Sequence, residues 1–268
     1  MLSTKKLIIF DGDGTLYLGN NVLPDVRETL SYIKNKGIHC FLYTNNSSKS
    51  ISDYHLKCKE LDLPFDKDTI MTSTEATLYY LKENNINRIY LLATPSVTSI
   101  FTESGIQLSE TDPECCVLTY DTSITYHKLT VLTNLVRNKL PYIATHPDMV
   151  CPSPEGPLPD IGTYIEMINL TTGREPDMIL GKPNIKSIRP ILARYNFSEE
   201  DVVIVGDRLY TDIKMGEGTN VTTVLTLTGE TTQDMITRSS IKPNYVIKNL
   251  EILKEYKKDD YVVGTIND

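Results

Sequence analysis

The sequence lacks the features that would place the protein in a membrane or in a disulfide-stabilised scaffold. No apolar run approaches the length of a membrane span, and the stretch MLSTKKLIIFDGD is too poor in apolar residues to be a signal peptide. The five cysteines are odd in number and lack C-x-x-C spacing, so neither a disulfide framework nor a zinc site is indicated. We therefore expect a cytoplasmic protein whose thiols are reduced.

Positive charge is also scarce. Lys and Arg number 27 against 35 Asp and Glu, which gives a net charge of −8. This balance argues against a general nucleic-acid or anionic-membrane surface, so we expect neither partner. The nucleotide-binding motifs G-x-x-x-x-G-K and G-x-G-x-x-G are absent as well. An anionic substrate would therefore have to be held by local positive charge or by a metal ion.

What is present is a regular alternation of strand-like and helix-like segments. KLIIF reads as a first strand, and LPDVRETLSYIKNKG reads as a helix that Gly37 ends. IHCFLYTNNSS reads as a second strand that runs into a polar loop, and the last third of the chain returns to strand and helix, as in DVVIVGDRLYTDIKMG. This order is typical of an α/β fold with a parallel sheet.

Several of these strand-like runs end on polar residues. The residues concerned are Asp11 and Asp13, Thr44 and Asn45, Lys182, and Asp207. Ligands of open α/β sheets bind beyond the carboxyl ends of the strands, so we expect these side chains to converge on one site. Carboxylates are ligands that Mg²⁺ prefers, while a hydroxyl, an amide and a lysine can hold a phosphate. The pattern predicts a site for phosphoryl chemistry.

Each of these residues, taken alone, also has an ordinary structural explanation. Asp11 and Asp13 could be turn residues beside glycines. Asp212 could be an acid in the first turn of a helix, and Lys182 could be an exposed turn lysine. The convergence of all of them, rather than any single residue, favours the functional interpretation.

Together, four motifs resemble those of the haloacid dehalogenase superfamily of phosphatases, in its NagD-type or p-nitrophenylphosphatase branch. D-x-D-G-T begins at Asp11, T-N-N-S begins at Thr44, the lysine of G-K-P is Lys182, and G-D-x-x-x-x-D ends at Asp212. The resemblance runs nearly end to end. It departs from the family at Gly12, where a larger apolar residue is usual, and the glycine predicts a loop that is held less firmly.

The resemblance implies a mechanism. Asp11 would attack phosphorus to form an aspartyl-phosphate, and Asp13 would act as general acid and then as general base. Mg²⁺ would be held by the Asp11 carboxylate, the Asp13 backbone carbonyl and Asp207. Thr44, Asn45 and Lys182 would bind the phosphate, and Asp212 would orient Lys182 or a metal-bound water. The substrate would be a small phosphomonoester.

The resemblance also implies a Rossmann-like parallel-sheet core, residues 1–78 and 180–268, with an inserted α/β cap domain at 79–179. The cap would select the substrate, and a homodimer through the cap is an arrangement that the resemblance allows. In the cap, THPD corresponds to a recurrent T-N-x-D segment of the branch. His146 and Asp148 are therefore candidates for contacts to the leaving group, although turn structure and helix capping could explain both.

Two other functions share these motifs in part. A receiver-like signalling module also carries a phosphorylatable Asp beside Mg²⁺, but an acid/base two residues after the nucleophile would speed loss of the phosphate, and a receiver has no cap. A phosphotransferase or mutase on the same core is not separated from a hydrolase by sequence. The physiological phosphate ester, the oligomeric state and the cap residues that set specificity are left open.

Overall fold

The computed structural model describes residues 4–153 and 156–254, which divide into two compact units. The first unit comprises Met1–Thr44, His55–Ile70 and Ile191–Asp268, and the second comprises Asn45–Tyr54 and Met71–Pro190. The second unit contains the whole predicted cap, 79–179, and also neighbouring residues that the sequence assigned to the core. The boundaries of a catalytic core remain a prediction, and its ends at 1–3 and 255–268 lie outside the described residues.

The first unit is built on a parallel sheet. Its strands, in spatial order, are β15 (Tyr245–Ile247), β14 (Thr222–Thr226), β13 (Val202–Gly206), β1 (Leu7–Phe10) and β4 (His39–Thr44), and β5 (Ile70–Thr72) is the edge strand where the chain passes into the second unit. Every residue of β1 is buried, as expected for a strand with neighbours on both sides and both faces covered. The central position of β1 brings the residue after Phe10 to the middle of the sheet edge.

Short helices connect these strands. They are α1 (Val26–Asn35), α2 (Ile51–Glu60), η2 (Lys67–Thr69), α7 (Arg189–Tyr195), η4 (Glu199–Asp201), η5 (Leu209–Ile213), η6 (Lys214–Gly216), α8 (Gln233–Arg238) and η7 (Leu250–Leu253), and the hairpin strands are β2 (Tyr17–Leu18) and β3 (Asn21–Val22). The predicted helix after the first strand is α1, which buries Leu30 and Ile33. Gly37 follows its end with φ +75°, the left-handed conformation that ends helices.

The second unit has its own parallel sheet. In spatial order its strands are β12 (Met178–Ile179), β9 (Tyr142–Ala144), β8 (Cys115–Leu118), β6 (Arg88–Leu92) and β7 (Gln107–Leu108). The other elements are α3 (Ser73–Glu83), α4 (Pro95–Glu103), α5 (Tyr126–Arg137), α6 (Ile161–Thr172), η3 (Ile185–Ile188) and the hairpin of β10 (Val150–Cys151) with β11 (Leu158–Pro159). The predicted α/β fold is confirmed.

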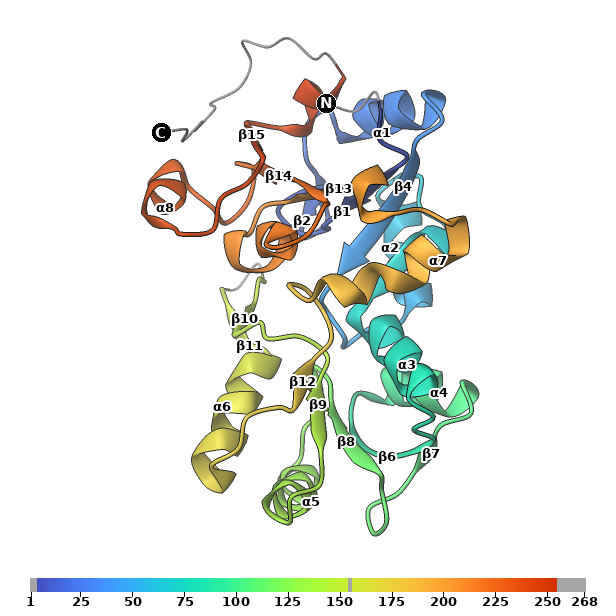
Figure 1. Cartoon of the computed structure of the whole chain (residues 1–268), viewed down its shortest axis with the longest axis vertical. Helices are drawn as coiled ribbons and strands as arrows, with labels where there is room; N and C mark the ends of the chain where they lie inside the picture. Colours follow the sequence, from blue (N-terminus) through green and yellow to red (C-terminus); the bar gives the residue numbers. More distant parts are fainter. Residues whose placement is uncertain (1–3, 154–155, 255–268) are drawn as a thin grey trace. The chain divides into compact units, whose positions relative to one another are not determined.

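Alternate residues of this second sheet pack into two hydrophobic cores, one on each face of the sheet. Cys116 and Leu118 pack with side chains of α5 and α6, whereas Cys115 and Val117 pack with α3 and α4. Figure 1 shows the two pairs of helices on opposite sides of the sheet. Within the described part of the chain, no helix combines the length and the apolar character that a membrane span requires.

Candidate active site

Asp11 and Asp13 stand at the carboxyl end of β1, in the middle of the first sheet. The Asp11 backbone N–H donates to Val205 O of β13 at 2.9 Å, which extends the ladder by one residue. The chain then turns sharply, because the Leu16 N–H donates to Gly12 O at 2.8 Å and the Gly14 N–H donates to Tyr17 O at 2.8 Å. The strand thus ends in a compact loop that carries both carboxylates.

Gly12 is explained by packing rather than by backbone freedom. Its φ is not positive, but a Cβ placed on it would lie 2.4 Å from the hydroxyl oxygen of Tyr17. Tyr17 is fully buried, and the Lys57 ammonium lies 3.9 Å from the centroid of its ring. The tyrosine fills the space where a larger residue would stand, and the looseness predicted for the loop stays a prediction.

Asp11, Asp207 and Asp212 form a cluster whose ligand atoms lie within 4.8 Å of one another. Asp207 is 2% exposed, and its Oδ2 accepts a hydrogen bond from the Glu230 N–H at 2.7 Å. Its Oδ1 is buried and has no hydrogen-bond partner among the described residues. Burial, and then the charges of Asp11 and Asp212, raise the pKa of Asp207 to about 7.

Three glycines lie so close to these carboxylates that a side chain on any of them would collide with one. A Cβ on Gly229 would lie 2.0 Å from Asp207 Oδ2, and one on Gly14, whose φ is +85°, would lie 2.4 Å from the same atom. A Cβ on Gly206 would lie 2.2 Å from Asp212 Cγ. Three carboxylates, one with an unsatisfied buried oxygen, fit a hard divalent cation such as Mg²⁺.

The Asp13 side chain has different surroundings from those of the cluster. Its Oδ1 accepts a hydrogen bond from the Gly19 N–H at 3.2 Å, and its Oδ2 lies 3.8 Å from Lys57 Nζ. Burial raises the pKa of Asp13 and Asp11 adds to the rise, while Lys57 opposes it. A carboxyl with a raised pKa suits a group that must give and take a proton. Lys57 lies on α2, and nothing local in the sequence indicates its proximity to Asp13.

In the second unit, the candidates Asn45 and Lys182 are held together. The Asn45 Oδ1 accepts a hydrogen bond from the Lys182 N–H at 2.8 Å, and its Nδ2 donates to Lys182 O at 3.0 Å and to Asp148 Oδ1 at 3.2 Å. Both residues are buried, with exposed fractions of 5% and 3%. Ser73 at the start of α3 donates to Asn45 O. Thr44, at the end of β4 in the first unit, is half-buried.

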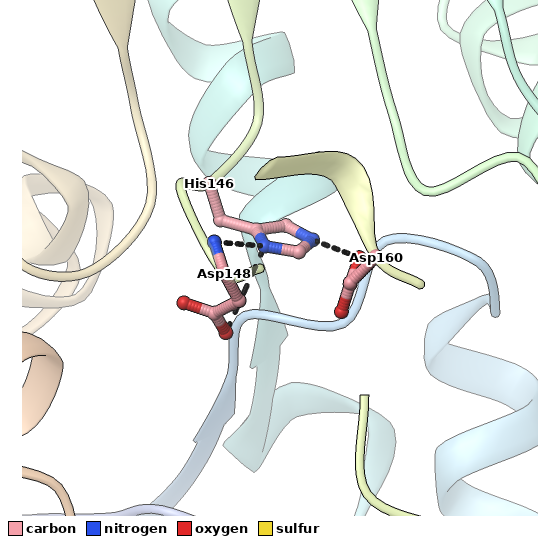
Figure 2. A group of neighbouring side chains, drawn as sticks. All are labelled: His146, Asp148 and Asp160. Carbon is pink, nitrogen blue, oxygen red and sulfur yellow. Dashed lines mark hydrogen bonds and ion pairs between the residues drawn. The ribbon is translucent and has the colours of Figure 1, made fainter. Parts of the chain in front are cut away.

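His146 lies between two carboxylates at the base of the hairpin β10–β11 (Figure 2). Its Nδ1 accepts a hydrogen bond from the Asp148 N–H at 3.4 Å and lies 3.7 Å from Asp148 Oδ2. Its Nε2 lies 3.6 Å from Asp160 Oδ1. Because Nδ1 accepts, the proton of the neutral ring is on Nε2 and faces Asp160. The imidazole therefore lies between the two ends of the hairpin.

Asp160 was not singled out in the sequence analysis. Asp160 is the N-cap of α6, and its Oδ1 accepts from the Ile161 N–H at 2.6 Å. The side chains of His146, Asp148 and Asp160 form a second group whose ligand atoms lie within 4.8 Å of one another. However, the carboxylates approach opposite nitrogens of His146, and a metal ion binds only one. The group is therefore better suited to a bridging imidazole than to a metal centre.

The sequence of the chain is similar to sequences of known hydrolases. Residues 8–107 match the family described as haloacid dehalogenase-like hydrolase, and residues 179–253 match the one described as HAD-hydrolase-like. The chain is 30% identical to the acid sugar phosphatase of Staphylococcus saprophyticus, over 94% of this chain and 98% of that protein.

Solved structures agree over almost the whole chain. The 4-nitrophenylphosphatase of Thermotoga maritima is 40% identical, with a TM-score of 0.91 over 96% of this chain and 99% of that chain. The p-nitrophenyl phosphatase of Archaeoglobus fulgidus is 28% identical, with a TM-score of 0.85 over 92% of this chain and 97% of that chain. The chain therefore belongs to the haloacid dehalogenase-like hydrolase family, as its four motifs indicated.

Proposed function

We propose that the protein is a Mg²⁺-dependent phosphomonoester hydrolase that acts on small-molecule phosphate esters, including p-nitrophenyl phosphate. The observation that carries the proposal is the cluster of Asp11 and Asp207, which follow β1 and β13, with Asp212 of η5. Asp13, whose pKa is raised, lies two residues after Asp11. The phosphatase names of the relatives support the same reaction. The acid sugar phosphatase makes sugar phosphates the first substrates to test.

The reaction would proceed in two steps. A carboxylate oxygen of Asp11 forms a bond to phosphorus, and the leaving oxygen of the ester departs with the proton of Asp13. Asp13, now ionised, takes a proton from a water molecule that attacks the phosphorus of the aspartyl-phosphate. Inorganic phosphate leaves, and the Asp11 carboxylate and the Asp13 acid are regenerated.

The metal would be held by the Asp11 carboxylate, the Asp13 backbone carbonyl and Asp207. When bound, Mg²⁺ supplies positive charge that offsets the repulsion between the nucleophile and the phosphoryl oxygens. The buried Asp207 Oδ1, which has no hydrogen-bond partner in the described part of the chain, supports this assignment because a cation would satisfy it. Asp212, within the same cluster, would orient a metal-bound water or Lys182.

Thr44, Asn45 and Lys182 would bind the transferring phosphoryl group through a hydroxyl, an amide and an ammonium. The two hydrogen bonds between the Asn45 amide and the Lys182 backbone support a shared role. In the cap, 79–179, His146 and Asp148 would set specificity by holding the base of the hairpin β10–β11. Asp148 is also the carboxylate that accepts from Asn45.

Phosphate release from a panel of sugar phosphates and p-nitrophenyl phosphate, with Mg²⁺ and with EDTA, tests the proposal. Turnover should require the metal and should become undetectable in Asp11→Asn, which keeps the shape of the side chain and removes its charge. A variant that keeps a tenth of wild-type activity would exclude Asp11 as the nucleophile. Release of free phosphate without an added acceptor distinguishes a hydrolase from a phosphotransferase.

A further inference from the structure

The segment that follows β14, residues 227–231, contacts both loops that carry the proposed metal ligands, and we call it the β14 loop. The Glu230 backbone N–H donates to Asp207 Oδ2 at 2.7 Å, and the Thr228 hydroxyl donates to Gly14 O at 2.7 Å. Asp207 follows β13, whereas Gly14 lies in the turn after β1. One short segment therefore touches the two halves of the proposed metal site.

The Thr228 hydroxyl is held from both sides. Its Oγ1 also lies 2.9 Å from Thr226 Oγ1, and Thr226 is fully buried at the end of β14. A threonine hydroxyl has one proton, and that of Thr228 points at Gly14 O. The hydrogen bond between the two hydroxyls therefore runs from Thr226 to Thr228, and it fixes the direction in which Thr228 donates.

Gly14 is the point at which the turn after β1 needs support. Its φ is +85°, a conformation that glycine adopts readily but does not hold by itself. Its N–H donates to Tyr17 O at 2.8 Å, and that N–H shares one planar peptide with the Asp13 carbonyl, a proposed metal ligand. Hydrogen bonds on both sides of Gly14, to Tyr17 and from Thr228, thus limit how far the Asp13 carbonyl can turn.

The β14 loop also sets the direction of the Asp207 carboxylate. Its Oδ2 is bonded to the Glu230 N–H, so the buried Oδ1, which has no hydrogen-bond partner within the described ranges, is the oxygen that remains for a cation. The Thr231 N–H donates to Asp207 O at 3.2 Å. The Glu230 side chain is anchored as well, because its Oε2 lies 3.0 Å from Arg208 Nε.

We propose that Thr228 is a positioning residue for metal binding. Through Gly14 O it holds the turn that carries Asp11 and Asp13, while the backbone of the β14 loop orients Asp207. The inference rests on the proposed Mg²⁺ site and adds to it a side chain outside the set of ligands. Because Thr228 carries no charge, its replacement leaves the charge of the site unchanged and acts on the metal through the position of the ligands.

The test measures Mg²⁺ binding to the full-length protein without substrate, by calorimetry and by the rise in melting temperature when Mg²⁺ is added to metal-free protein. Thr228→Val keeps the shape of the side chain and removes the hydroxyl, and it should weaken Mg²⁺ binding about tenfold. Thr228→Ser keeps the hydroxyl and should bind Mg²⁺ nearly as the wild type does. Thr222→Val makes the same change at the other end of β14, and as the control it should bind like the wild type.

Melting temperatures with and without Mg²⁺ separate positioning from a structural role. Thr228→Val should gain less from Mg²⁺ than the wild type gains. A melting temperature lowered by the same amount in EDTA and in Mg²⁺ would mean that the hydroxyl supports only the fold, and would overturn the proposal. Equal Mg²⁺ affinities of Thr228→Val and the wild type, or equal losses in Thr228→Val and Thr222→Val, would overturn it too while leaving the proposed function intact. A wild type that binds no Mg²⁺ would instead overturn the metal assignment itself, and this inference with it.

Discussion

The stability of the metal-free protein should fall as the pH rises, because of Asp207. Its pKa in the folded protein is about 7, against an ordinary value of 3.8. The folded state therefore binds this proton more tightly than the unfolded state does. This contribution to stability is complete below about pH 4 and is lost as the pH rises through about 7. A shift of about three pH units corresponds to about 4 kcal/mol in the free energy of unfolding.

The assay is urea unfolding in EDTA at intervals from pH 5 to pH 8.5. Asp207→Asn removes the titrating group, so the difference in free energy of unfolding between variant and wild type should grow in favour of the variant as the pH rises. The exposed Asp68→Asn serves as the control and should parallel the wild type. Mg²⁺ should stabilise the wild type more at pH 8 than at pH 5. Parallel pH profiles for wild type and Asp207→Asn would refute the reasoning.

Three further predictions concern catalysis and packing. Asp13→Asn should slow turnover by about 10² to 10⁴-fold, with the smaller loss for p-nitrophenyl phosphate, whose leaving group needs less protonation; equal losses for an alkyl phosphate would count against the acid role. His146→Asn should change the kcat/KM values of different esters relative to one another by a few-fold to about 10²-fold, because asparagine is too short to span both carboxylates. The exposed His127→Asn is its control, and a common loss for all esters would show a structural role only. Gly12→Ala should lower the melting temperature because its Cβ collides with Tyr17, and an unchanged value would show that the tyrosine moves aside freely.

Local pattern was enough to predict the α/β class, the order of strands and helices, and the family. The apolar run before Asp11 forms a buried strand because a central parallel strand is covered on both faces, and its length and composition are visible in the chain itself. The helix α1 and its end at Gly37 follow in the same way from apolar spacing and a residue that tolerates positive φ. Most motif residues were found because they follow a recognisable strand, whereas Asp212, which lies in η5, was found by its spacing from Asp207.

Which side chains contact one another was decided only by the tertiary structure. Gly12 and Tyr17 are close in sequence, yet only the folded turn shows that one leaves room for the other. His146 and Asp160 flank a hairpin, and Asn45 meets Asp148 across 103 positions of the chain. Periodicity reports which face of an element is buried, but not which side chain of another element lies within hydrogen-bonding distance. That pairing depends on strand register and on how helices pack on the sheet. The sequence could present His146 only as a candidate for substrate contact, whereas the structure places its ring between Asp148 and Asp160.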